Sequence, residues 1–269
     1  MTLVLIVLHP DRSAVVRVVV TAVAIIGFIV ERIRSDYRFW FIIAALLLGG
    51  ALSGWSVSDN HRYLMAYWAL AISLALNADN WERVLSLSAR RMIGLCFLFA
   101  CIWKTITPDF LDGTFFHYSL LTDSRFREVA HWIGGINAPM ADLNRAARAA
   151  LFRFDSNLVA VQFYDPATIQ TIAHALTWWT IGIESAIAIV FLLPLRNAFT
   201  CIRDVVLLVF SITTYALAPV IGFGWVLLIM GMIQVEWRKK SVRWMYVGTF
   251  VLLELYLLPW KKALSLLQS

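Results

Sequence analysis

The sequence predicts an all-α integral membrane protein, a bundle of about eight transmembrane helices with a long external connection that contains short amphipathic helices. Hydrophobic residues make up 61% of the 269 residues and charged residues only 15%. Mean hydropathy is +0.75, and a soluble domain of this length cannot bury that much apolar surface. Many of the twelve tryptophans lie near the ends of apolar runs, as in interfacial aromatic belts.

Eight apolar runs approach or exceed the ~17–20 residues that cross a bilayer as a helix. The N-terminal "MTLVLIVLHP" is too short to cross and has no basic region or cleavage site of a signal peptide, so we expect an interfacial segment. "LAPVIGFGW" is short and uncharged, which leaves a membrane-embedded hairpin over 200–236 as an alternative. The predicted spans are 14–31, 39–56, 62–77, 91–107, 169–194, 200–217, 222–236 and 243–260.

The basic residues orient these spans, because cytoplasmic loops carry the excess of Lys and Arg. The connections after the first, third, fifth and seventh spans are rich in them, whereas the short segments on the other side hold few. The sequence therefore predicts a multi-pass protein of the cell membrane with both termini and the 108–168 loop non-cytoplasmic. The net charge of +6 follows from these loops and not from a nucleic-acid-binding face, so the expected partner is the lipid bilayer. The basic residues of the cytoplasmic connections are Arg32, Arg34, Arg38, Arg83, Arg90, Arg91, Arg196, Arg203, Arg238, Lys239, Lys240 and Arg243.

The long connection contains "DLNRAARAALFRFD", which has the pattern of an amphipathic helix lying in the membrane interface. It is interpreted either as a lid over an outward-facing cavity or as a solvated connector. The chain has no internal repeat and is treated as one domain, 1–269. The helix would group Leu143, Ala147, Ala150, Leu151 and Phe154 on one side, and turn Arg145, Arg148 and Arg153 towards headgroups or solvent.

Three polar residues converge at the outer ends of the third and fourth spans. Asn60 and His61 begin the third span in "SDNHRYLMAYW", and Lys104 closes the fourth in "CIWKTITPD". Partial desolvation disfavours the ammonium form of Lys104 and makes a neutral amine available as a base, with His61 as a proton-handling partner. Alternatively, Lys104 snorkels to the headgroups and pairs with Asp109 or Asp112.

Glu184 lies near the middle of the fifth span, where a carboxyl group is costly and normally faces a partner or a cavity. Proton handling and interhelix hydrogen bonding are both consistent with it. Thr214 and Tyr215 near the end of the sixth span are candidates to line a polar pocket, although interhelix bonding is their more frequent role. Arg203 and Asp204 are expected to form a cytoplasmic boundary pair. The three cysteines show no metal-ligand spacing or disulfide framework, and no metal site is expected.

Two motifs together resemble the HTTM (horizontally transferred transmembrane) family, which is related to the membrane domain of vitamin K-dependent gamma-carboxylase. "DNHRYLMAYWAL" is similar to the family's "NNHSYL"-type segment. "FACIWKTITPDFLDG" is similar to its helix ending in "AG-x-x-K-L" and the acidic turn after it, with Lys104 in the lysine position and Phe110 for a tryptophan. "GIESAIAIVFLLP" is similar to the family helix that carries a buried acid. The resemblance covers about 14–235.

The resemblance implies that Lys104 is a base toward a quinol, with Asn60 and His61 orienting the reacting group. In the carboxylase the matching lysine deprotonates vitamin K hydroquinone. This chain departs from that pattern, because Trp103 replaces a second lysine and no large luminal domain follows the last helix, so protein carboxylation is not expected. A quinol-linked or other small-molecule reaction is the leading hypothesis. A non-enzymatic DoxX-like membrane subunit and a proton-coupled transporter are the alternatives.

Overall fold

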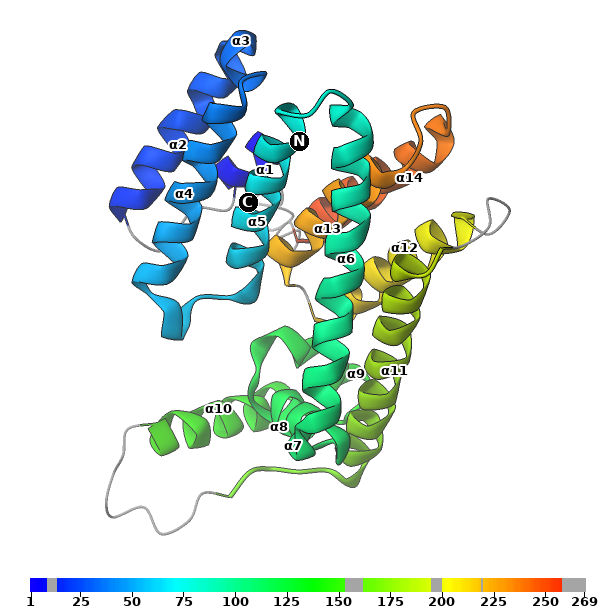
Figure 1. Cartoon of the computed structure of the whole chain (residues 1–269). Helices are drawn as coiled ribbons and strands as arrows, with labels where there is room; N and C mark the ends of the chain where they lie inside the picture. Colours follow the sequence, from blue (N-terminus) through cyan, green and yellow to red (C-terminus); the bar gives the residue numbers. More distant parts are fainter. Residues whose placement is uncertain (9–13, 153–161, 195–199, 219, 258–269) are drawn as a thin grey trace, which may run out of the picture. The chain divides into compact units, whose positions relative to one another are not determined.

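The computed structural model describes residues 1–8, 14–152, 162–194, 200–218 and 220–257 (Figure 1). All regular structure in these ranges is helical. The helices are α1 (Thr2–Leu8), α2 (Ala14–Ile29), α3 (Glu31–Arg34), α4 (Tyr37–Ser53), η1 (Trp55–Val57), α5 (Asn60–Leu76), α6 (Trp81–Ile106), α7 (Pro108–Leu111), α8 (Thr114–Thr122), η2 (Ser124–Phe126), α9 (Arg127–Trp132), α10 (Ala138–Phe152), α11 (Ala167–Leu192), α12 (Thr200–Leu217), α13 (Ile221–Gln234) and α14 (Lys240–Leu257).

Each of the eight predicted spans contains one of the longer helices, and the all-α prediction is confirmed. Among the described residues, α6, α11 and α12 are long and apolar enough to cross a membrane. The other five spans stay predictions. One boundary was wrong: α6 begins at Trp81, ten residues before the predicted start. Its first three turns, "WERVLSLSAR", carry charges that lower hydropathy but include no helix breaker, so the helix extends through them.

The chain divides into two compact units. Unit 1 comprises Met1–Ile93, Pro194–Ile212 and Val220–Ser269, and unit 2 comprises Gly94–Leu193 and Thr213–Pro219. In unit 1, α4 and α5 pack along each other, and α1, α2 and α13 join them. The Ser73 hydroxyl donates 2.8 Å to the carbonyl of Tyr37, which ties α5 to the start of α4.

In unit 2, the C-terminal half of α6 runs antiparallel to the C-terminal half of α11. Gly94 packs against Leu192, and a Cβ at that position would fall 2.7 Å from the Leu192 Cγ, so the close approach requires glycine. Further along, the Cys101 thiol lies 3.4 Å from the Ser185 hydroxyl. This register places the end of α6 beside the middle of α11. The N-terminal turns of α11 are therefore covered by the segment that follows α6.

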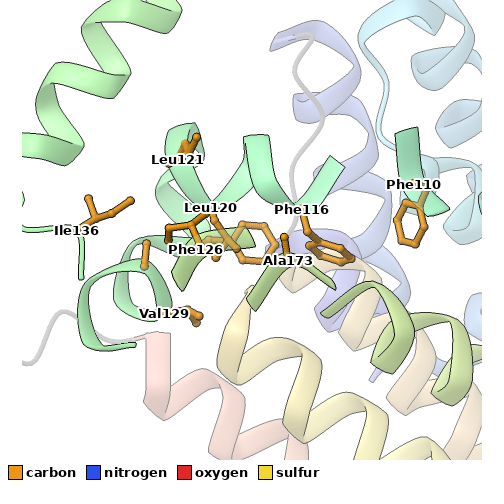
Figure 2. Close-up of a cluster of buried hydrophobic side chains, with 10 residues drawn as sticks. Phe110, Phe116, Leu120, Leu121, Phe126, Val129, Ile136 and Ala173 are labelled. Atoms are coloured by element: carbon orange, nitrogen blue, oxygen red, sulfur yellow. The ribbon is translucent and has the colours of Figure 1, made fainter. Parts of the chain in front are cut away.

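That segment folds into a small helical layer on the first turns of α11 (Figure 2). Helix α8 packs on α11, and α7, α9 and α10 pack on α8. Aromatic rings fill its centre: Phe116 meets Phe110 and Phe126 edge to face, with centroids 5.5 and 5.9 Å apart. Edge-to-face pairs add to the stabilisation from burial. The buried cluster is Phe110, Phe116, Leu120, Leu121, Phe126, Val129, Ala130, Ile136, Ile169 and Ala173. We call this layer, residues 108–152, the loop layer.

Helix α10 confirms the helix predicted in the connection, but the side of it that packs against the rest of the loop layer differs from the predicted one. Its packed side carries Asn144, which is 1% exposed. Asn144 donates 3.0 Å to the Tyr164 carbonyl and accepts a 2.8 Å bond from the Tyr164 N–H. Leu143, on the predicted apolar side, is 67% exposed. That side is thus left open and does not join the loop-layer core. Arg153 and Phe154 lie outside the described residues.

Candidate functional site

Lys104 and Glu184 form an ion pair in unit 2. The Lys104 Nζ donates to the Glu184 Oε1. Lys104 is the third residue from the end of α6, because Pro108 at the start of α7 stops the helix. The antiparallel register brings that end to the level of Glu184. Two residues that the sequence flagged separately therefore form one charged pair.

Both side chains of this pair are shielded from water. The Lys104 side chain is 19% exposed and the Glu184 side chain 9%. The second carboxylate oxygen of Glu184, Oε2, is buried and has no hydrogen-bond partner among the described residues. An ionised carboxylate accepts several hydrogen bonds, and an unmet buried acceptor costs about 1–3 kcal/mol. Oε2 therefore offers an acceptor position to a group that carries an O–H or N–H.

The ammonium group of Lys104 also faces an aromatic ring. Its Nζ lies 5.3 Å from the centroid of Phe110, which is 6% exposed and belongs to the loop-layer core. An ammonium over a ring face is attracted by the ring quadrupole. The pair thus links three elements, α6, α11 and α7. Its geometry depends on the loop layer as well as on the two long helices.

Polar and soft side chains surround the pair within unit 2. Tyr215 is 2% exposed and interacts electrostatically with Glu184 and Cys96. Thr214 is half-buried beside it on α12. Ser185 and Cys101 contact each other next to the pair. Unit 2 thus contains four predicted site residues, Lys104, Glu184, Thr214 and Tyr215.

Asn60 and His61 belong to unit 1. They form the first turn of α5, where Asn60 is exposed and His61 is 7% exposed. Their pairing with Lys104 stays a prediction of the sequence. The alternative that Lys104 is neutralised by Asp109 or Asp112 is replaced by the observed pair with Glu184. Asp112 instead accepts a 2.9 Å bond from the Thr114 N–H, which lowers the pKa of Asp112.

Two histidines fasten the loop layer to the start of α11. The His117 Nε2 lies 2.9 Å from the Asp165 Oδ1. His174 packs against Gly113, which has a positive φ of 85°. Reasoning from the sequence did not predict the contact of His117 with Asp165, because side chains within a long connection have no distinctive spacing. Their role here is to hold the loop layer in place.

Asp204 on α12 belongs to a buried polar cluster of unit 1 that the sequence did not predict. Its position at a cytoplasmic boundary with Arg203 stays a prediction, and both residues are 6% exposed. The Asp204 Oδ1 accepts bonds from Gln234 (2.6 Å) and Tyr246 (2.9 Å). The cluster could have been predicted from the polar residue that lies near the end of each of three apolar runs. Such clusters join helices inside membrane bundles.

The donor set around Lys104 and Glu184 suits proton transfer better than metal binding. One carboxylate, one amine, a phenol and two thiols are not the oxygen-rich or imidazole-rich sets that metals prefer. No group of three or more His, Cys, Asp or Glu side chains suited to a metal occurs in the part of the chain that the structure describes. Comparison with protein-family models, curated proteins and solved structures gives no match.

Proposed function

We propose that this chain is a membrane enzyme whose Lys104–Glu184 pair accepts a proton from a weakly acidic, lipid-soluble small molecule, with a quinol as the substrate class. The observation that carries this proposal is the buried acceptor Oε2 of Glu184, next to an ammonium group. Purely structural buried pairs have their remaining lone pairs satisfied by further hydrogen bonds. Here one strong acceptor is left for an incoming hydroxyl group.

The chemistry that the pair supports is a balanced proton transfer. The substrate hydroxyl donates its proton to the carboxylate of Glu184, so the O–H bond of the substrate breaks and an O–H bond on Glu184 forms. Lys104 stays an ammonium and pairs with the new substrate oxyanion. Total charge is unchanged by this step, which matters because separating charge in a low-dielectric site is costly. A phenol or quinol hydroxyl, with an ordinary pKa of about 10, is a weaker acid than a carboxyl group, so the transfer depends on the Lys104 ammonium stabilising the substrate oxyanion.

The surroundings of the pair support this role. Phe110 holds the ammonium from a third direction, so Lys104 is kept in place while its carboxylate partner changes charge. Tyr215 supplies a hydroxyl group near Glu184, and such a group can orient a ring substrate. The resemblance to the HTTM family points to the same lysine but implies that it is the base; the ion pair with Glu184 instead favours an ammonium at Lys104 and the carboxylate as proton acceptor.

The test uses the full-length protein in detergent and 1,4-naphthohydroquinone under anaerobic conditions. The hydroquinone monoanion has its own ultraviolet absorbance, so a difference spectrum reports deprotonation on binding. Wild type is expected to bind the probe as the monoanion at a pH where the free probe is neutral. Lys104→Met keeps most of the stem, and should reduce the anion signal about tenfold or more, since a charge-assisted bond is lost. Lys240→Met, at an exposed position, is the matched control.

An unchanged anion signal in Lys104→Met, or no binding by wild type, contradicts the proposal. The same buried oxygen also favours a second candidate, proton carriage without chemistry. Proteoliposomes distinguish the two. A transporter would move protons across the membrane in a Glu184-dependent manner without any added hydroquinone, whereas the enzyme proposal predicts no such flux.

A further inference from the structure

The loop layer carries a shallow pocket that is open to solvent. Five apolar residues line it: Leu120, Leu121, Ala130, Ile136 and Ala141. Leu120, Leu121 and Ile136, labelled in Figure 2, are among them. Its polar lining is Thr122, Asp123, Ser124, Arg127 and Arg145. The pocket therefore combines an apolar base with a polar rim.

The rim of the pocket carries a net positive charge, because its acidic residue is already neutralised by an arginine. The acidic residue of the rim, Asp123, is paired with Arg125. The guanidinium of Arg125 donates to the Asp123 carboxylate from Nε at 3.0 and 3.1 Å and from Nη2 at 2.5 Å. Burial raises the pKa of Asp123, but the bonds from Arg125 and the charges of Arg125 and Arg148 outweigh it and hold the pKa below its ordinary value. Asp123 thus remains a filled acceptor and does not compete for the other arginines.

Two further arginines, Arg127 and Arg145, line the pocket, and a third, Arg148, contacts the lining residue Thr122. Arg127 donates its backbone N–H to the Ser124 carbonyl, and its exposed side chain makes no ion pair or hydrogen bond within the described residues. Arg145 pairs with Asp142, which is 67% exposed, and a water-exposed pair of this kind is weak and easily exchanged. Arg148 donates 3.4 Å to the carbonyl of Thr122. Guanidinium groups arranged in this way match the geometry of a phosphate group.

The packing of the loop layer on α11 places the pocket near the membrane surface. With 26 residues, α11 is about 39 Å long, whereas the hydrocarbon core is ~30 Å thick and needs about 20 residues. The excess of about six residues lies at the N-terminal end, where Thr168, Gln170 and Thr171 are polar. The loop-layer core packs on Ile169 and Ala173 in this stretch. The loop layer therefore lies at the level of the lipid headgroups.

Large apolar side chains are exposed on the two helices that border the pocket. Ala130 of α9 and Ala141 of α10 line the pocket. On the same two helices, or immediately after them, Trp132 is 78% exposed, Ile133 64% and Leu143 67%. At headgroup level, exposed tryptophan and aliphatic side chains are typical of surfaces that enter the interface.

We infer that this pocket binds the phosphate group of a phospholipid headgroup, with Arg127 and Arg145 as its principal ligands and the acyl chains lying against Trp132, Ile133 and Leu143. A phospholipid satisfies both features together, since its phosphate suits the arginine rim and its chains suit the exposed apolar residues. Free inorganic phosphate would satisfy only the first. The site is separate from the Lys104–Glu184 pair and does not depend on the function proposed for it.

The test is native mass spectrometry of the full-length protein reconstituted with phosphatidylglycerol and then stripped with detergent. Wild type is expected to retain one phospholipid. The double variant Arg127→Gln/Arg145→Gln should retain it about tenfold less, since charge-assisted contacts to the phosphate are lost. Arg127→Lys should recover part of the binding because it restores the charge without the planar fork. Arg238→Gln, which removes an exposed arginine from unit 1, is the control and should behave as wild type.

Equal retention of phospholipid by wild type and the double variant would overturn the inference. A second arm adds inorganic phosphate to the delipidated protein. If phosphate binds in an Arg127-dependent manner while phospholipid does not, the site takes the free anion and the lipid assignment is wrong. Melting temperatures of all variants, measured in the same detergent, confirm that loss of binding is not loss of folding. If the double variant unfolds, Arg127→Gln alone, at an exposed position, decides the question.

Discussion

Lys104 on α6 donates a hydrogen bond from its ammonium group to the carboxylate of Glu184 on α11, eighty residues further along the chain. This contact joins the two most unusual charges of the sequence. Each alone has an ordinary explanation, a snorkelling lysine or an interhelix acid. Together they form a shielded pair with a spare acceptor oxygen, and this combination supports proton chemistry.

A double-mutant cycle measures the coupling within the pair. Lys104→Met and Glu184→Gln should each destabilise the protein, by about 3–5 kcal/mol where the remaining group stays charged and buried. The double variant should be more stable than the sum of the two changes predicts, with a coupling of about 1–3 kcal/mol. The measurement is the free energy of unfolding in mixed detergent and SDS micelles. Additive effects would mean that the two groups do not interact in the folded protein.

Two glycines of unit 2 form a matched pair for backbone strain. Gly113 and Gly135 both have positive φ, 85° and 76°. An added Cβ at Gly113 would lie 3.0 Å from the His174 Nδ1, whereas at Gly135 no atom lies within 4 Å. Gly135→Ala should cost about 1–2 kcal/mol from the φ angle alone, and Gly113→Ala more, because His174 must also move. Melting temperatures of the two variants check the order. A larger loss at Gly135 would contradict the packing described here.

The pair of Asp123 and Arg125 predicts an acid-dependent loss of stability. The pKa of Asp123 is held below its ordinary value of 3.8. The stabilisation that ionised Asp123 gives the folded protein is therefore complete at a pH above its ordinary pKa. It is lost as the pH falls through the lower pKa of the folded state. Asp123→Asn should remove about 1 kcal/mol at about pH 6 and little at about pH 3. Arg125→Gln should show the same pH dependence. A loss from Asp123→Asn that is equal at both pH values would refute the assignment.

Asn144 is expected to hold the segment before α11 through its two bonds to the backbone of Tyr164. Asn144→Ala should destabilise the protein by about 1–3 kcal/mol, because two hydrogen bonds to the backbone of Tyr164 are lost, each worth about 0.5–1.5 kcal/mol. The residue-specific readout is hydrogen exchange of the Tyr164 amide, which should be protected in wild type and exchange faster in the variant. Gln170→Ala, at an exposed position on α11, should leave both quantities nearly unchanged. An unprotected Tyr164 amide in wild type would argue against this contact.

The longer helices could be predicted from sequence because apolar runs of this length have few other structures open to them in a bilayer. The start of α6 could not be predicted, because Trp81–Arg90 is amphipathic. A prediction from hydropathy alone assigns such a charged stretch to a loop. Gly94 carried a signal that was overlooked, because a small residue inside an apolar helix often marks close contact with another helix.

The candidate site was only half predictable. Lys104 and Glu184 were each identified as costly charges, but their contact depends on the register between α6 and α11. That register is set by close packing at Gly94 and by the loop layer on the outer turns of α11. Neither is visible in local sequence patterns. The partners of Asp204 were not predictable for the same reason, because Gln234 and Tyr246 come from two later helices.

The most direct test of the central claim is the infrared difference spectrum of the full-length protein on anaerobic addition of 1,4-naphthohydroquinone. If the pair accepts the proton of the substrate, a protonated-carboxyl band should appear in wild type, shift in deuterated water and be absent from Glu184→Gln. A spectrum without that band, or the same band in Glu184→Gln, would contradict the role of Glu184 as the proton acceptor.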